Sequence, residues 1–213
     1  MAHLAQNVID TALRMSREGL SAGRSGNVSV RDGERVLITP TGMAYEALTS
    51  DDIVSMALDG SVPDGSRKPS SEWHFHAAVY AARPDIGAVV HTHSNAATAL
   101  ACLEEGIPAF HYMVAAAGGH DIRCAPYATF GTEELAAHAV RALEGRQACL
   151  LAHHGVIACG STLAKAYDLA VEVETLAEQY ARARTLGAVP LLDAREMDRV
   201  LEKFKGYGQQ AKG

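Results

Sequence analysis

The 213-residue sequence has no long hydrophobic run. Its longest apolar stretches, such as residues 86–90 and 148–152, are much shorter than the roughly 20 residues that cross a bilayer as a helix. The N-terminal segment mixes acidic and basic residues and lacks the apolar centre of a signal peptide. These absences argue against a membrane protein and against a secreted one, so we expect a soluble protein of the cytoplasm.

Blocks of basic residues are also missing. The formal net charge is -6, and the one modest basic cluster is formed by Lys203 and Lys205 near the C-terminus. A protein that binds nucleic acid or an anionic membrane surface normally carries a basic patch, so we expect neither partner. A small anionic ligand is compatible with this charge, because a local site of backbone N–H groups and hydroxyls is enough to hold it.

The cysteines and lysines argue against two further kinds of chemistry. The four cysteines have no C-x-x-C spacing, so small buried thiols in a reducing compartment are the expected state. The five lysines, at positions 68, 165, 203, 205 and 212, all lie outside the apolar strands. A lysine that forms a Schiff base needs desolvation to lower its pKa, so a covalent amine mechanism is not expected.

The sequence does contain a regular series of helix and strand signals. With 48% hydrophobic and 21% charged residues, it fits one globular α/β domain over residues 1–213, without repeats or linkers. The pattern predicts helices over residues 7–18, 72–82, 95–103, 133–143, 162–185 and 191–204. It predicts strands over residues 27–31, 35–39, 53–58, 86–90, 148–152 and 156–159.

Histidines follow two of the predicted buried strands. In AVVHTHSN, His91 and His93 are two positions apart, so on an extended chain both point to the same face. The second apolar run ends in His153 and His154, which face opposite sides if the strand continues, so only one of them joins the pair. Three imidazoles with an open position make a catalytic zinc site. Histidines that merely satisfy their own hydrogen bonds at strand ends are an equally weighted alternative.

Glu72 and His76 begin the helix that follows the first hairpin. Glu72 is compatible with a fourth metal ligand, a general base beside a metal, or a carboxylate that complements the helix dipole. Taken alone, the last of these is favoured. Glu72 and His76 also form a Glu-x-x-x-His pair, which we rank lower as a metal site because helix histidines beside apolar residues are usually packed.

Three separate elements suit an anion. A glycine loop precedes Asn27, a TPTG turn holds Thr41 and Gly42, and Ser70 and Ser71 stand at a helix start. Each offers short hydroxyl or amide donors and accessible backbone N–H groups. None matches a P-loop or a dinucleotide fingerprint. Separately they are ordinary turns and caps, whereas together they suit a single phosphate monoester.

Eight motifs run in order over nearly the whole chain: SAGRSGNVSVR, LITPTG, KPSSEW-x-FH, VVHTHS, HYMVAAAGG, CAPYATFGT, LLAHHGVIACG and EKFKGYG. They resemble the metal-dependent class II aldolases of the L-fuculose-1-phosphate aldolase type. The resemblance implies that zinc binds to His91, His93 and His154, and that Glu72 is a ligand in the resting enzyme that is displaced to act as acid or base. Cobalt and manganese also suit three imidazoles and a carboxylate.

The resemblance also assigns the substrate-binding positions. The phosphate-binding positions of the family fall on Asn27, Thr41, Gly42, Ser70 and Ser71. Tyr112 matches the tyrosine that a neighbouring subunit contributes as proton donor, and Tyr207 matches a tail tyrosine near the site. Around the aldehyde half of the substrate we expect Phe130, Phe204 and Tyr207.

The fold and reaction that the resemblance implies are specific. The fold is a three-layer α/β/α arrangement around a central, largely antiparallel sheet, assembled as a homotetramer with active sites at subunit interfaces. The expected reaction cleaves a ketose 1-phosphate, first of all L-fuculose 1-phosphate, reversibly to dihydroxyacetone phosphate and L-lactaldehyde. The alternatives are an aldolase for 5-deoxyribulose or 5-methylthioribulose 1-phosphate in nucleoside by-product salvage, and a methylthioribulose-1-phosphate dehydratase. The wider family also holds epimerases and the noncatalytic adducin head, so membership alone does not fix the reaction.

Overall fold

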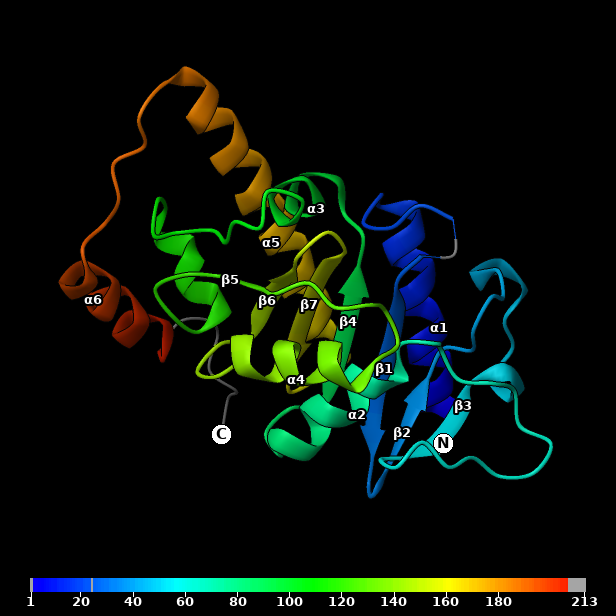
Figure 1. Cartoon of the computed structure of the whole chain (residues 1–213). Helices are drawn as coiled ribbons and strands as arrows, with labels where there is room; N and C mark the ends of the chain where they lie inside the picture. Colours follow the sequence, from blue (N-terminus) through cyan, green and yellow to red (C-terminus); the bar gives the residue numbers. More distant parts are fainter. Residues whose placement is uncertain (1, 24, 207–213) are drawn as a thin grey trace.

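A seven-stranded sheet forms the centre of the molecule (Figure 1). The computed structural model describes residues 2–23 and 25–206. The strands are β1 (Asn27–Asp32), β2 (Arg35–Ile38), β3 (Val54–Ala57), β4 (Ala88–Thr92), β5 (Arg123–Ala125), β6 (Ala148–Leu151) and β7 (Gly155–Gly160). They are arranged in the order β3-β2-β1-β4-β7-β6-β5, and every neighbouring pair is antiparallel except β5 and β6. The predicted largely antiparallel sheet is therefore confirmed.

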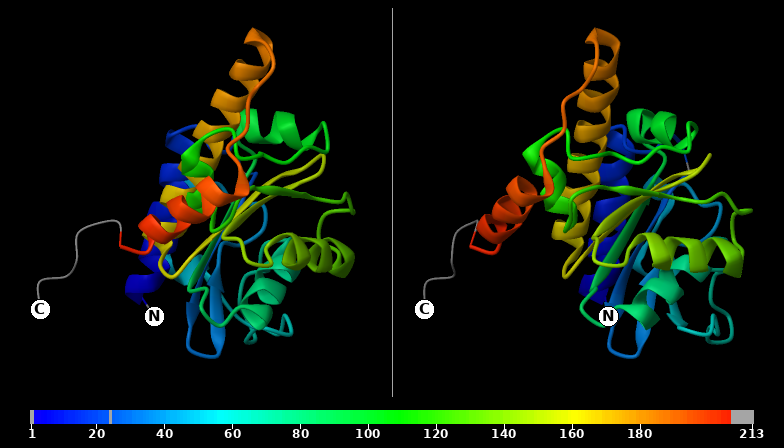
Figure 2. Two further views of the ribbon diagram at one scale, coloured as in Figure 1. Left: turned by 90° about the vertical axis from the view of Figure 1, so that its left-hand side faces the viewer. Right: turned by 60° about the vertical axis from the view of Figure 1, so that its left-hand side comes forward.

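Helices cover both faces of this sheet and make three layers (Figure 2). They are α1 (Ala2–Arg17), α2 (Trp73–Ala82), α3 (Asn95–Ala101), α4 (Glu133–Ala142), α5 (Leu163–Leu186) and α6 (Ala194–Phe204), with short 3-10 turns η1 (Tyr45–Ala47), η2 (Ser50–Asp52) and η3 (Tyr112–Ala117). One hydrophobic core joins α1, α3 and α5 to one face of the sheet. A second core joins α2 and α4 to the other face. The α/β/α layering is thus as predicted.

Strand β4 lies at the centre of the sheet, between β1 and β7. Its five residues are all buried, and they alternate between the two cores: Ala88 and Val90 face the α1 and α5 side, and Val89 faces the α2 and α4 side. A strand that is covered on both faces reads as a continuous apolar run, which is how AVV appears in the sequence. The end of β4, where His91 lies, is therefore held by pairing with β1 on one edge and with β7 on the other.

Several predicted boundaries are wrong in an informative way. The strand predicted over 86–90 spans 88–92, because His91 pairs with Asn27 on one side and with Ile157 on the other. The helix predicted from residue 191 begins at Ala194, because the carboxylate of Asp193 caps it by accepting the Glu196 backbone N–H at 2.8 Å.

Strand β5 and the 3-10 turns η1, η2 and η3 were not predicted. Strand β5 has three residues, too few to show the alternation that marks a strand. The 3-10 turn η3 begins at Tyr112, runs through an Ala-rich stretch to Ala117 and is followed by its C-cap Gly118, which has a left-handed φ of 87°.

Helix α5 is the longest of the described helices, at 24 residues. Its C-terminal end and the segment that leads to α6 project beyond the edge of the sheet (Figure 2). Leu186, at this end, is 90% exposed. Among the described residues, no helix is both long enough and apolar enough to span a membrane.

Candidate metal centre

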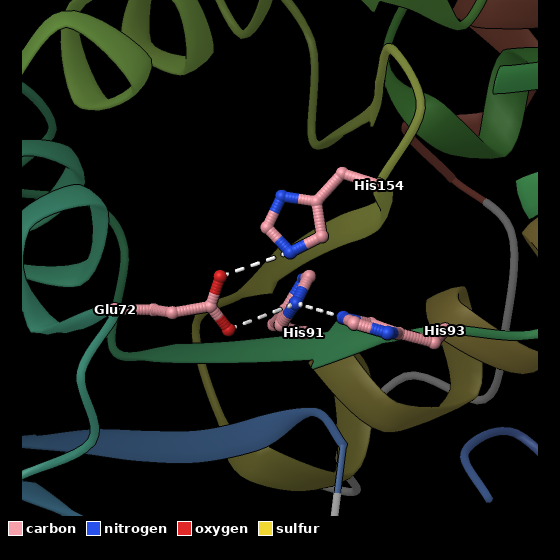
Figure 3. A group of neighbouring side chains, drawn as sticks. All are labelled: Glu72, His91, His93 and His154. Atoms are coloured by element: carbon pink, nitrogen blue, oxygen red, sulfur yellow. Dashed lines mark hydrogen bonds and ion pairs between the residues drawn. The ribbon is translucent and has the colours of Figure 1, made fainter. Parts of the chain in front are cut away.

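Four side chains with metal-binding atoms converge at one end of the central strands (Figure 3). Glu72 comes from the N-cap position of α2, His91 from β4, His93 from just beyond β4, and His154 from the turn between β6 and β7. One ligand atom from each residue lies within 4.8 Å of all the others. Residues far apart in the sequence are thus brought within the reach of one ion.

His91 is held in the orientation that a metal ligand needs. The ring is fully buried, and its Nδ1 lies 2.8 Å from the backbone carbonyl oxygen of Val156, which can only accept a hydrogen bond. Nδ1 is therefore protonated, and in the neutral ring Nε2 carries a lone pair. This Nε2 lies 3.2 Å from Glu72 Oε2 and 2.9 Å from His93 Nε2. A carbonyl partner on the far nitrogen is the usual support of a metal-binding histidine.

The remaining contacts leave polar atoms that a cation would satisfy. His154 Nε2 lies 2.9 Å from Glu72 Oε1, but this buried oxygen accepts no hydrogen bond of regular geometry from the described residues. The three imidazole rings meet edge to face, with centroids 4.8 to 5.0 Å apart. Buried acceptor atoms that face each other cost free energy unless a positive charge lies between them. Three imidazoles and one carboxylate therefore fit a divalent metal such as zinc.

Burial and neighbouring charges shift the pKa values in this cluster. Burial acts to raise the pKa of Glu72, but His91 and His154 outweigh it, so the net pKa lies well below the usual carboxyl range. Burial, together with His91 and His154, lowers the pKa of His93 to about 4. At neutral pH these shifts favour an ionised carboxylate and a neutral His93 imidazole, which are the forms that bind a metal.

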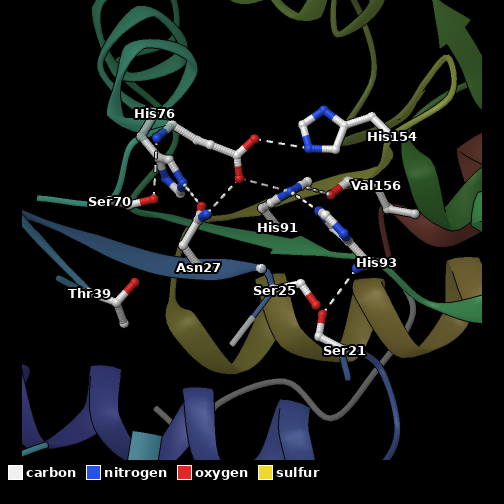
Figure 4. Close-up of polar contacts among 12 residues, drawn as sticks. Ser21, Ser25, Asn27, Thr39, Ser70, His76, His91, His93, His154 and Val156 are labelled. Carbon is white, nitrogen blue, oxygen red and sulfur yellow. Dashed lines mark hydrogen bonds and ion pairs between the residues drawn. The ribbon is translucent and has the colours of Figure 1, made fainter. Parts of the chain in front are cut away.

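The glycine-rich loop before β1 supports the histidines (Figure 4). The Ser21 hydroxyl accepts the backbone N–H of His93 at 3.0 Å. Gly26 has a φ of 87°, and a Cβ at this position would lie 2.6 Å from the His91 carbonyl oxygen. The loop can therefore pass close to β4 only because residue 26 has no side chain.

The turn after β6 decides between the two adjacent histidines. Strand β6 ends at Leu151, so the expected alternation of a continuing strand does not apply to His153 and His154. His153 has a left-handed φ of 54°, and its Nε2 lies 3.1 Å from Glu104 Oε1, outside the four-residue cluster. His154 is the one of the pair that points to Glu72.

The contacts of Glu72 differ from the reading favoured for it on sequence alone, whereas His76 is a buried helix histidine, as favoured. Glu72 occupies the N-cap position of α2 rather than its first turn, and its carboxylate makes no cap hydrogen bond. It faces the histidines instead. His76 is not part of the cluster, because its nitrogens contact Ser29 and Asn27. The proposed Glu-x-x-x-His metal pair is therefore not formed.

A cavity of about 330 Å³ opens beside the cluster. It is lined by Glu72, His93 and His154, by Phe130, and by every position predicted to bind phosphate: Asn27, Thr41, Gly42, Ser70 and Ser71. Within the described part of the chain, no lysine or arginine lines it. An anion in this cavity would be held by hydroxyls, an amide and backbone N–H groups beside the metal site.

The other predicted site residues lie elsewhere in this chain. Tyr112, which is 51% exposed, and Phe204 line a separate cavity of about 360 Å³ between η3 and α6. Neither residue lines the cavity beside the metal cluster. Tyr207 lies outside the described residues.

Two aromatic residues that line the metal-side cavity, Tyr45 and Tyr127, were not singled out on sequence grounds, and His153, the alternative to His154, also lines it. The Tyr45 hydroxyl donates to the Gly26 carbonyl oxygen at 2.7 Å and so ties η1 to the glycine loop. Tyr127 is 57% exposed, and its ring stands edge-on to His153. Tyr127 lies within the quoted CAPYATFGT motif, which is the one signal that pointed to this region.

The sequence matches known proteins over nearly its full length. Residues 6–181 match the family described as Class II Aldolase and Adducin N-terminal domain. A Rhodospirillum rubrum protein named 5-methylthioribulose-1-phosphate/5-deoxyribulose-1-phosphate aldolase is 57% identical over 208 residues, which is 98% of this chain and 94% of that protein. An Escherichia coli L-fuculose phosphate aldolase is 53% identical over 206 residues, 96% of this chain and 95% of that protein.

The fold is similar to that of a solved structure with a related name. A solved structure titled L-fuculose 1-phosphate aldolase superposes with a TM-score of 0.93 at 42% sequence identity, covering 96% of this chain and 97% of that one. The agreement therefore extends from the sequence to the complete arrangement of helices and strands.

Proposed function

The chain belongs to the class II aldolase and adducin N-terminal domain family, and we propose that it cleaves a ketose 1-phosphate, preferentially L-fuculose 1-phosphate, to dihydroxyacetone phosphate and a short aldehyde. It is an aldolase, a carbon–carbon lyase of a metal-dependent family. The single observation that carries the substrate class is the convergence of a three-histidine, one-glutamate cluster with a cavity rich in phosphate-binding groups.

We assign zinc as the metal, held by His91, His93, His154 and, in the resting state, Glu72; cobalt and manganese are the alternatives. A divalent cation bound there supplies Lewis-acid polarisation of the substrate oxygens near the bond that breaks. Because the charge of the cation would stabilise the electrons left when the carbon–carbon bond breaks, the reaction needs no Schiff-base lysine. This agrees with the five lysines, which all lie outside the apolar strands.

The side chains of the protein orient the substrate and move its protons. Asn27, Thr41, Gly42, Ser70 and Ser71 bind the phosphate and so fix the dihydroxyacetone half. Glu72, kept ionised by its neighbours, takes and returns the proton on the dihydroxyacetone carbon. This assignment is supported by its place between the cluster and the cavity.

Tyr112, contributed by a neighbouring subunit, exchanges the proton on the hydroxyl of the aldehyde half. The proposal includes a homotetramer with active sites at its interfaces, and it is supported by the location of Tyr112 and Phe204 away from the cavity of their own chain. Phe130, on the cavity wall, would form the aldehyde-side pocket with Phe204, Tyr207 and residues of a partner subunit. A cytoplasmic location belongs to the same proposal, supported by four free thiols.

A second substrate is favoured by one specific observation. The 57% identical relative carries a name that refers to 5-methylthioribulose and 5-deoxyribulose 1-phosphate. These sugars share the phosphate and dihydroxyacetone end with L-fuculose 1-phosphate and differ at the far end. The polar half of the site would therefore act identically, and the aldehyde-side residues alone would select among the substrates.

The test is a panel of the three ketose 1-phosphates with the zinc-loaded protein, measured as kcat/KM for release of dihydroxyacetone phosphate. The proposal predicts turnover of all three, with L-fuculose 1-phosphate preferred. A preference for the 5-methylthio compound would replace that first choice with the second. Turnover that keeps the carbon chain intact, without dihydroxyacetone phosphate, would identify a dehydratase and contradict the aldolase proposal.

A further inference from the structure

A chain of buried hydrogen bonds leads from helix α2 to the metal cluster, and Figure 4 shows its inner part at His76 and Asn27. The Tyr80 hydroxyl lies 2.8 Å from Ser29 Oγ, and Ser29 Oγ lies 2.7 Å from His76 Nδ1. His76 Nε2 lies 2.5 Å from Asn27 Oδ1, and Asn27 Nδ2 lies 2.9 Å from Glu72 Oε2. All five residues are at least 93% buried, so water does not replace any of these bonds at low cost.

The direction of this chain follows from the chemistry at its inner end. The Asn27 amide nitrogen faces Glu72 Oε2 at 2.9 Å and donates to it, because an amide nitrogen can only donate a hydrogen bond. The Asn27 oxygen then faces His76 and can only accept, which requires a proton on His76 Nε2. A neutral imidazole has one N–H, so His76 Nδ1 accepts from the Ser29 hydroxyl. The Ser29 oxygen in turn accepts from Tyr80.

The imidazole of His76 is neutral under all ordinary conditions. The ring is fully buried, and burial, with a smaller contribution from His91, lowers the pKa of His76 to about 3. The contacts above therefore involve one tautomer of a neutral ring rather than an imidazolium. Among the described residues, the ring nitrogens are hydrogen-bonded to Ser29 and Asn27, and neither partner is a carboxylate.

We propose that His76 is a positioning residue for the active site, and that its Nε2–H, fixed by Ser29 and Tyr80, holds the Asn27 amide with its nitrogen toward Glu72. This inference rests on the proposed function, in which Asn27 binds phosphate and Glu72 moves a proton. An asparagine amide has two nearly isosteric orientations, and in the reversed one its oxygen would face the Glu72 carboxylate. The correct orientation gives Glu72 a donor and leaves a second N–H on the same nitrogen, on a side chain that lines the cavity.

The most direct test is neutron diffraction from a crystal of the metal-loaded protein exchanged into D₂O. We expect deuterium on His76 Nε2, deuterium on Ser29 Oγ directed at His76 Nδ1, and the Asn27 ND₂ group toward Glu72. Deuterium on His76 Nδ1, or a reversed Asn27 amide, would overturn the proposal. This experiment does not depend on knowing the substrate.

Variants supply the functional half of the test. His76→Phe keeps a ring but removes the donor, and it should lower kcat roughly 10- to 100-fold, the usual effect of losing a residue that supports a metal-site ligand. Bound zinc should stay stoichiometric, because His76 is hydrogen-bonded to Ser29 and Asn27 and not to any of the three histidines of the cluster. His76→Gln places an amide N–H near the position of Nε2 and should recover most of the loss.

Val79→Ala is the control for stability. Val79 is 1% exposed on the same helix and belongs to the α2 and α4 core, outside the chain of hydrogen bonds. Val79→Ala should lower Tm by about as much as His76→Phe does, but it should leave kcat unchanged. Equal kcat losses at equal Tm losses, or unchanged kcat in His76→Phe, would contradict a positioning role. If wild-type protein cleaves none of the ketose 1-phosphates, the proposed function fails, while the neutron map still decides the proton positions.

Discussion

Three residues of the candidate metal centre, His91, His93 and Glu72, are each held by a partner from a different part of the chain. The Val156 carbonyl orients His91, and the Ser21 hydroxyl holds the backbone of His93. Asn27 donates to Glu72 from the first strand. Partners of this kind fix ring orientation and ligand basicity, so loss of one weakens metal binding even where all four ligands remain.

His154 and His153 are adjacent, but only His154 belongs to the cluster. His154→Ala should abolish stoichiometric zinc binding and cleavage, because two histidines and a movable carboxylate do not make a stable tetrahedral site. His153→Ala should keep its zinc, because the His153 side chain is 47% exposed and pairs with Glu104. Metal analysis of the two purified variants makes the comparison. Stoichiometric zinc in His154→Ala would show that the assignment is wrong.

The buried His76 predicts a dependence of stability on pH. Its folded pKa of about 3 lies below the ordinary value of 6.5, so between these values the unfolded chain binds a proton that the folded protein does not. Stability therefore falls as the pH falls, and this residue accounts for about 2 kcal/mol of the loss between pH 7 and pH 5. Urea unfolding of metal-free wild type and His76→Gln at both pH values measures it. Equal losses in the two proteins would contradict the prediction.

At the scale of elements, the end of β4 and the start of β7, which lie next to His93 and His154, have closely packed backbones. A Cβ at Gly155, the first residue of β7, would lie 2.3 Å from the Thr92 carbonyl oxygen and 3.1 Å from the His93 ring. Gly155→Ala should therefore push the two strand ends apart, cost about 3 kcal/mol and weaken zinc binding.

Gly145→Ala is the matched control for that substitution. Gly145 has a φ of 65°, but a Cβ there would meet nothing within 4 Å. It should cost about 1 kcal/mol from backbone strain alone and leave zinc affinity unchanged. Chemical unfolding and competition with a zinc-binding dye measure both quantities. Equal zinc affinities in the two variants would show that strand spacing does not control the site.

The elements also show what the sequence could reveal. The alternation at residues 27–31 and the apolar run before His91 were enough to predict β1 and β4, because hydrophobic patterning follows burial directly. The argument from two histidine-bearing strand ends predicted that His91 and His93 lie near either His153 or His154, and the structure brings His154 to them. The turn at His153 was not predictable, because its left-handed φ depends on contacts with the distant Glu104 and with the Ala101 carbonyl.

The hydrogen-bond chain through His76 could not be predicted from the sequence for a similar reason. A histidine beside Phe75 on a helix looks like a packed residue, and it is indeed fully buried. Its partners, Ser29 and Asn27, lie more than 45 residues away, and only the pairing of β1 with β4 brings them under α2. Periodicity identifies which faces are buried, but it does not identify the polar contacts made across two elements.

At the scale of the whole molecule, the active site needs more than one chain in the proposed homotetramer. The cluster and Tyr112 lie in different regions of the subunit. His154→Ala and Tyr112→Phe homotetramers should each be nearly inactive. Co-expression of the two variants should restore activity, because some mixed interfaces combine an intact cluster with an intact Tyr112.

The purified mixed tetramers should therefore be much more active than either variant alone. The control is a mixture of His154→Ala with His93→Ala, in which every cluster lacks a ligand and no interface regains one. Failure of the first mixture to exceed this control would contradict a tyrosine shared between subunits.

The most direct measurement of the central claim combines metal content with cleavage. The protein is assayed for dihydroxyacetone phosphate release from L-fuculose 1-phosphate as purified, after removal of metal by a chelator, and after zinc is added back. The proposed metal centre of Glu72, His91, His93 and His154 predicts that release stops when the metal is removed and returns with zinc. Undiminished release from verified metal-free protein would contradict it.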